Sequence, residues 1–219
     1  MAELSKREFT KSRHAQRREL FKACRTVTKG TRWRSNQGVL FAQDGGWFMS
    51  VQEMTDILRE RTRARVSVKP MAIDPIFWRL VGHPELCDQP LSFRAYGWMK
   101  CGLLILEEFE VSEDGGVDHI ARRLLEHADR TLDEVAREWT ADEFLKHIDN
   151  CRKPDQWFVT RVTTLLAAQR YDEAQALCEE SAAHGSSGGF WSSSLGTFNE
   201  MVIRFVAEQR TVENSGLQT

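Results

Sequence analysis

The sequence predicts an α+β protein, in which a small antiparallel sheet of about four to five strands is covered by an N-terminal helix and a C-terminal helical array. Three observations favour this class. An apolar stripe at helical spacing opens the chain, alternating apolar residues and turn sequences fill the middle, and helical periodicity returns after Gly116. Strands precede helices without alternating with them, which is typical of α+β proteins and not of parallel sheets.

The first predicted element is an amphipathic helix. Leu20, Phe21, Cys24 and Val27 recur at helical spacing among basic residues, so the helix carries a narrow apolar stripe. Gly30 is suited to end it, because glycine readily adopts the left-handed conformation that closes many helices.

A β-hairpin is predicted next. The side chains alternate between the two strand faces over residues 39–42 and again over 47–51, with Asp44-Gly45-Gly46 between the two runs. Asp-Gly pairs favour the positive φ angles that tight hairpin turns require. The turn therefore sets the pairing of these two strands.

Further strands are predicted around a short helix. Residues 64–69 alternate between apolar and polar side chains, which indicates a strand ending at Pro70. Asp74 followed by Pro75 is typical of an N-cap with proline in the first turn, so a short helix should begin there. The apolar run within residues 93–111 predicts one or two more strands.

Helices should fill the rest of the chain. Apolar stripes predict helices over 117–139, and two further helices, over 157–168 and 171–184, with a very short connection. Thr140 to Glu143 and Thr197 to Glu200 both match the capping box that opens a helix. We expect residues 1–116 to hold the N-terminal helix and sheet, residues 117–210 to form a helical region packed on it within one compact domain, and residues 211–219 to be a flexible tail.

Charge is distributed unevenly along the chain. The 219 residues include 30 Lys and Arg and 32 Asp and Glu, a formal net charge of −2. Residues 1–34 hold eleven bases against three acids, whereas residues 107–149 hold fourteen acids against five bases. This asymmetry predicts a basic N-terminal helix and an acidic helical surface.

The basic helix has two interpretations. Its arginines and lysines could contact phosphates and release counterions, which makes a nucleic-acid-associated accessory protein the alternative function. The residues for that role are Arg13, Arg17, Arg18, Lys22 and Arg25. We favour the other interpretation, in which the helix docks on the sheet and places its cations against the acidic helices.

Several function classes are disfavoured by missing motifs. The sequence holds no run of 18 apolar residues and no apolar segment behind its charged N-terminus, so we expect a cytoplasmic protein that contacts no membrane. Its five cysteines should be free and mostly buried thiols. Phosphate-binding loops and dinucleotide glycine patterns do not stand out. Two His-x-x-x-Cys pairs, His83/Cys87 and His147/Cys151, could each present two zinc ligands, but neither is accompanied by a Cys-x-x-Cys, so we predict no catalytic residues, no cofactor and no metal.

One segment carries a resemblance. Residues 63–78, RARVSVKPMAIDPIFW, combine a strand ending in Val-Lys-Pro with the start of a short helix. This segment, together with the order of a basic helix, a meandering sheet and acidic helices over residues 5–150, resembles uncharacterised bacterial families. These families are often encoded as immunity partners of interbacterial toxins. The resemblance implies a protein that binds a toxin and assigns no role to individual residues.

We therefore expect a non-enzymatic immunity protein that occludes a cognate toxin acting in the cytosol, such as a basic nuclease. An acidic surface would steer a cationic toxin toward the chain, and aromatic anchors would hold the complex. Nucleic acid is the less favoured partner, and the sequence leaves a homo-oligomer open. The predicted partner-binding residues are Glu107, Glu110, Asp133, Glu134, Glu138, Trp139, Phe190 and Trp191.

Overall fold

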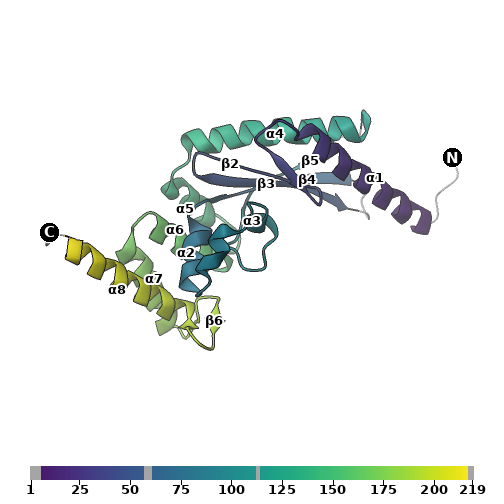
Figure 1. Cartoon of the computed structure of the whole chain (residues 1–219). Helices are drawn as coiled ribbons and strands as arrows, with labels where there is room; N and C mark the ends of the chain where they lie inside the picture. Colours follow the sequence, from purple (N-terminus) through teal and green to yellow (C-terminus); the bar gives the residue numbers. More distant parts are fainter. Residues whose placement is uncertain (1–5, 57–60, 112–113, 217–219) are drawn as a thin grey trace. The chain divides into compact units, whose positions relative to one another are not determined.

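The computed structural model describes residues 6–56, 61–111 and 114–216 (Figure 1). The chain forms two compact units. Unit 1 comprises residues 1–69 and 103–138, and unit 2 comprises residues 70–102 and 139–219. This division differs from the boundary expected at residue 116, because the helix that begins there belongs to the unit that contains the sheet.

A five-stranded antiparallel sheet forms the centre of unit 1, which confirms the predicted fold class. The strands are adjacent in chain order, from β1 to β5, and β5 pairs with β4 through a register shift between Val66 and Ser67. Their bounds are β1 (Arg34–Asn36), β2 (Val39–Asp44), β3 (Trp47–Asp56), β4 (Arg61–Pro70) and β5 (Leu104–Glu110).

The predicted hairpin is confirmed. Asp44 at the end of β2 pairs with Trp47 at the start of β3, so the turn is a two-residue loop. Gly45 and Gly46 occupy it with φ angles of 51° and 85°, both in the left-handed region that this turn requires. The alternation on either side of the turn therefore continues in register into the sheet.

Two long helices complete unit 1. α1 (Lys6–Val27) packs against α4 (Gly116–Glu138) and β1, while α4 runs along one face of the sheet and contacts β2 and β3 (Figure 1). α4 buries an apolar stripe that includes Ile120, Leu124 and Leu132. Since α1 buries residues on one side, Leu20 among them, its opposite side faces solvent.

Unit 2 is mainly helical. Its core is built around α2, α6 and α8, where Phe77, Trp78 and Phe198 are buried. A two-stranded sheet, β6 and β7, precedes α8. The elements are α2 (Ile73–Leu80), η1 (Pro84–Asp88), α3 (Phe93–Tyr96), α5 (Ala141–Asp149), η2 (Pro154–Trp157), α6 (Phe158–Ala167), α7 (Tyr171–Ala183), β6 (Trp191–Ser192), β7 (Gly196–Thr197) and α8 (Phe198–Gly216).

Both predicted capping boxes are at helix starts. The Thr140 hydroxyl accepts a hydrogen bond from the Glu143 backbone N–H at 3.3 Å, at the start of α5. The second is reciprocal: Thr197 Oγ1 accepts from the Glu200 N–H at 3.3 Å, and the Glu200 carboxylate accepts from the Thr197 N–H at 2.8 Å. These local hydrogen bonds satisfy backbone donors that have no partner within the helix.

Three predictions about local structure were wrong. Ala72, not Asp74, is the N-cap of α2, and the Asp74 carboxylate is buried among tertiary partners instead. Residues 93–103 are not a strand, because Phe93–Tyr96 forms α3 and the sheet resumes only at Leu104. α8 continues to Gly216, past the predicted start of a tail at residue 211; residues 217–219 lie outside the described residues.

Candidate functional site

Unit 2 exposes three aromatic side chains. Trp98 is 77% exposed, Trp191 is 65% exposed and Tyr96 is 39% exposed. Large exposed aromatic rings are informative, because a soluble chain normally buries them or uses them in contacts. Trp98 was missed in the sequence, since a strand predicted over that segment gave no reason to place its ring outside.

Backbone alternation explains why Trp191 is outside while its neighbour is inside. Phe190 packs against the core of unit 2 and meets Phe77 edge-on, with ring centroids 5.8 Å apart. Trp191 follows on β6, where successive side chains point to opposite faces. The structure therefore keeps Trp191 as an exposed anchor, whereas Phe190 serves to fix the β6–β7 hairpin to the core.

Contacts link the surroundings of the two tryptophans. The His83 ring meets Trp98 with centroids 6.3 Å apart. Gly82, beside His83, lies against Leu195 of the β6–β7 hairpin, since a Cβ built on this glycine would be 3.1 Å from Leu195 Cδ1. Arg204 of α8 holds the Leu195 carbonyl at 2.8 Å. We use the name aromatic patch for the exposed Tyr96, Trp98 and Trp191 together with His83 and Leu195, which belong to the segments that these contacts bring together.

Arg32 engages part of the predicted acidic rim. Its guanidinium donates to Asp129 at 2.8 Å and to Asp133 at 2.5 Å, and it also pairs with Asp44. Burial lowers the pKa of Arg32, but the hydrogen bonds with Asp133 and Asp129 outweigh this effect and raise it. Asp133 therefore joins α4 to the strand region, and its charge is largely compensated within unit 1.

The other predicted acids of unit 1 lie on β5 and at the end of α4. Glu107 is 2.5 Å from His127 Nε2, and Glu138 receives the Arg137 guanidinium at 2.7 Å. Glu110 lines a surface hollow of about 640 Å³ between β5 and α4. Glu134 is exposed on α4, on the helix turn that carries Asp133.

The predicted site residues thus fall into both units. Glu107, Glu110, Asp133, Glu134 and Glu138 belong to unit 1, and the three aromatic residues belong to unit 2. Trp139 is half-buried and stacks on His147, with centroids 4.4 Å apart and planes 13° apart. Trp191 is therefore the most exposed of the three predicted anchors.

The cations of α1 divide between two sides of the helix. Arg17 turns to the sheet and lies 3.2 Å from the buried carboxylate of Glu53, and Arg13 is half-buried. A second set is exposed, at spacings of three, four and seven residues that define one helix face. This set, which we call the cationic row, comprises Arg7, Lys11, Arg18, Lys22 and Arg25.

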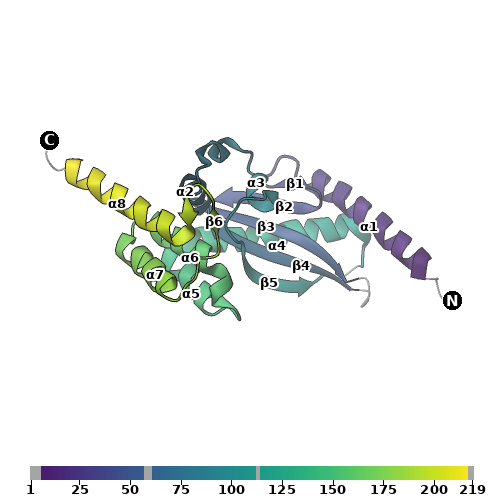
Figure 2. The ribbon, with the colours of Figure 1, turned by 90° about the horizontal axis from the view of Figure 1, so that it is seen from below.

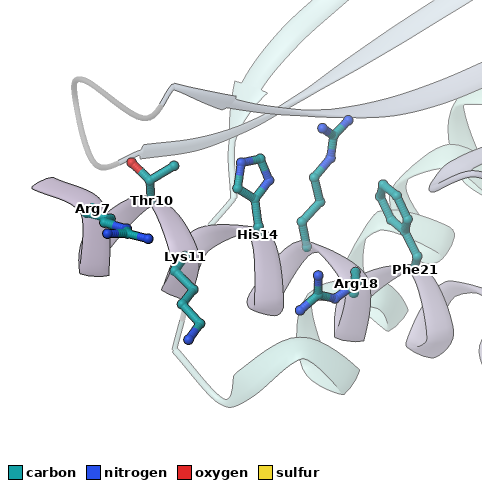
Figure 3. A pocket seen from close by; sticks show the side chains of 7 residues that line it. Arg7, Thr10, Lys11, His14, Arg18 and Phe21 are labelled. Atoms are coloured by element: carbon teal, nitrogen blue, oxygen red, sulfur yellow. The ribbon is translucent and has the colours of Figure 1, made fainter.

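A wide hollow of about 980 Å³ borders the cationic row (Figure 3). Thr10, His14 and Phe21 point to one side of α1, and Lys11 and Arg18 point to the other (Figure 3). The described residues that line the hollow are Arg7, Thr10, Lys11, His14, Arg17, Arg18 and Phe21, and none of these is an acid. The hollow is therefore an electropositive surface.

The five cysteines are free thiols, and Cys24, Cys101 and Cys178 are buried as expected. Burial, with a smaller contribution from the nearby Glu53 charge, raises the pKa of Cys24 to about 11. Burial likewise raises the pKa of Cys178 to about 12, with a smaller contribution from Glu179. Both thiols therefore stay protonated at neutral pH and are poor nucleophiles.

This difference in environment predicts selective alkylation. With iodoacetamide at pH 8, the exposed Cys87 should be modified first, and Cys24 and Cys178 should remain unmodified while the protein is folded. Peptide mass spectrometry measures the order, and denatured protein provides the control. The cysteine thiols ionise at lower pH in the unfolded chain than they do when buried in the folded protein. The free energy of unfolding should therefore also fall as pH rises from 9 to about 11. Rapid modification of Cys24 in folded protein would contradict this assignment.

Within residues 6–56, 61–111 and 114–216, no group of three or more His, Cys, Asp or Glu side chains is arranged to hold a metal ion. No helix in this part of the chain has the length and apolar composition needed to cross a bilayer. Comparisons with protein-family models, curated proteins and solved structures gave no match.

Proposed function

We propose that this protein is a non-catalytic binding protein that covers a partner protein with its aromatic patch, as an immunity protein covers a cognate toxin. The observation that carries the proposal is the exposure of Trp98 and Trp191, at 77% and 65%. Tryptophan is enriched among the few interface residues that dominate binding energy, because it combines a large apolar surface with few rotatable bonds.

The energetic argument follows from buried area. Covering about 150 Å² of one tryptophan contributes about 4 kcal/mol to the free energy of binding, before the entropic cost of association is subtracted. The hairpin that carries Trp191 is held by Phe190 and by the Arg204 contact, so little conformational entropy is lost when a partner binds. An anchor on a fixed hairpin therefore suits a tight inhibitory complex.

The acidic residues of unit 1 have a separate role in this proposal. Glu134, Glu138 and Glu110 are exposed, and acids of this kind accelerate the approach of a cationic partner. A basic nuclease-like toxin fits this charge pattern. Since exposed charges contribute mainly to the association rate, neutralising them should slow capture, especially at low salt, and should change dissociation little.

The aromatic anchors provide the direct test. The chain is co-expressed with the protein encoded beside it, and the complex is purified and measured by calorimetry. Trp98→Ala combined with Trp191→Ala should weaken binding by at least about 30-fold, since truncating each anchor lowers the binding free energy by about 1–2 kcal/mol or more. The double variant should also lose the ability to rescue cells from a toxic neighbour.

Val212→Ala is the matched control. Val212 is 67% exposed in the same unit but lies near the far end of α8, so its truncation should leave binding unchanged. No complex with the neighbouring protein, or a complex that tolerates both tryptophan substitutions, would contradict the proposal.

A further inference from the structure

The exposed side of α1 offers a second binding site, in a different unit from the aromatic patch. Members of the cationic row follow one another at intervals of four, seven, four and three residues, so they share one face of the helix. That face is opposite the side that buries Leu20, Ala23 and Cys24. From Arg7 to Arg25 the row extends about 27 Å along the helix axis at a rise of about 1.5 Å per residue.

Three acids of unit 1 are bound by cations outside the row. Asp129 and Asp133 of α4 are bound by Arg32, and the buried Glu53 is bound by Arg17. Lys22 pairs with Glu19 of the same helix at 2.8 Å, but both side chains remain more than half exposed. α1 packs on α4 and β1, but the cation that binds Asp129 and Asp133 of α4 is Arg32, which lies outside α1, whereas the cationic row is exposed.

The shape of unit 1 makes the row accessible. In both ribbon views the first turns of α1 extend past the ends of the described strands (Figures 1 and 2). The hollow of about 980 Å³ adjoins these turns, and Arg7, Lys11 and Arg18 line it. A long, rigid partner can therefore approach the first turns of α1 without meeting the described strands.

We propose that the cationic row binds the phosphate backbone of double-stranded DNA. The row is straight and rigid, which matches a rigid polyanion with evenly spaced charges of about one per 1.7 Å. A helix of about 10–12 Å diameter fits the major groove of B-DNA, about 12 Å wide, whereas the major groove of duplex RNA is too narrow for it. This site does not depend on the proposed binding of a partner protein by the aromatic patch, and it would give the chain a second binding activity.

The net charge of −2 does not oppose this binding. At physiological ionic strength, charges farther away than about 8 Å are largely screened, so the DNA responds to the row and not to the whole chain. The contacts are to phosphates, which carry no base information, and the binding is therefore independent of DNA sequence.

Salt-dependent binding of the full chain to a 20-base-pair DNA duplex tests the site. If Arg7, Lys11 and Arg18 contact phosphates, together they contribute about −2.7 to the slope of log K against log salt. The triple variant Arg7→Ala, Lys11→Ala, Arg18→Ala should lose that contribution, so its affinity should be lower by at least about 10-fold at 50 mM salt. Replacing Arg7 and Arg18 with lysine should preserve binding, because phosphates recognise the charge.

A second triple variant controls for net charge. Arg122→Ala, Arg137→Ala and Arg152→Ala remove the same charge from exposed positions outside the cationic row, and this variant should bind DNA as the original chain does. Circular dichroism verifies that each variant remains folded. Absence of DNA binding at 50 mM salt, or equal losses in both triple variants, would overturn the proposal. Binding of poly-glutamate in preference to the duplex would overturn it in favour of an acidic protein partner.

Discussion

Replacing Asp74 with alanine should lower the free energy of unfolding by about 3–5 kcal/mol, because it breaks a buried ion pair. Asp74 is fully buried in unit 2. One carboxylate oxygen accepts from Arg94 Nη1 at 2.9 Å, and the other accepts from the Cys101 backbone N–H at 2.9 Å. Alanine would leave the Arg94 guanidinium, whose side chain is only 11% exposed, without its counterion.

Two companion variants separate the charge from the hydrogen bond. Asp74→Asn retains the size of the side chain and an oxygen acceptor for the Cys101 N–H. It should therefore lower the free energy of unfolding by less than Asp74→Ala does. Combining Asp74→Ala with Arg94→Ala should recover part of the loss, since no unpaired charge then remains buried. Urea unfolding measures all four proteins. A loss below about 1 kcal/mol for Asp74→Ala would show that this carboxylate does not stabilise the fold.

Gly38→Ala should be the next most destabilising of the changes considered, at about 2–4 kcal/mol. Gly38 lies in the turn between β1 and β2 at φ +79°, a left-handed conformation that costs a residue with a Cβ about 1 kcal/mol. A Cβ at this position would also overlap the Phe21 ring of α1. The ring is itself held under the Arg17 guanidinium, 5.2 Å from its centroid, so it cannot move without disturbing that contact.

Gly46→Ala isolates the backbone contribution. Gly46 has a similar φ of +85°, but a Cβ there meets no heavy atom of the described residues within 4 Å. Gly46→Ala should therefore lower the free energy of unfolding by only about 1 kcal/mol. Thermal unfolding of both variants measures the difference, which reports the packing of Phe21 on the turn. Equal losses would mean that α1 does not press on Gly38.

Local interactions explain which elements could be predicted from the sequence. The hairpin at Gly45 and the helix starts at Thr140 and Thr197 are set by residues two or three positions apart, and all three are present in the structure. In each case the same few residues supply both the preferred backbone conformation and the hydrogen-bond partner. Such elements therefore need no knowledge of tertiary contacts.

Long-range contacts explain the elements that were missed. Asp74 has the sequence context of an N-cap, but its partners come from Arg94 and Cys101, twenty or more residues later. The segment around Trp98 has a strand-like composition, but the Trp78 indole N–H donates to the Met99 carbonyl at 2.7 Å and binds the segment to α2. The spacing of apolar and polar residues along the sequence does not indicate these long-range contacts.

The candidate sites were predictable in composition and not in geometry. The sequence showed the basic character of α1, yet only the packing of the helix shows that Arg17, itself 46% exposed, pairs with the buried Glu53 while Arg7 and Lys11 lie on the opposite side from Leu20 and Cys24. In the same way, the pair Phe190 and Trp191 was identifiable as aromatic, but the contact of Phe190 with Phe77 decides which ring faces solvent. The direction of each side chain depended on packing partners from other elements.

The interleaving of the two units along the chain has a consequence for biosynthesis. Unit 1 cannot complete its sheet until β5 has left the ribosome, by which time the whole segment 70–102 has already emerged. That segment must wait in turn for residues 139–219 before its own core can close. Neither unit corresponds to a continuous stretch of the gene, so a truncation placed anywhere between residues 69 and 139 will divide at least one unit and expose its apolar interior to aggregation.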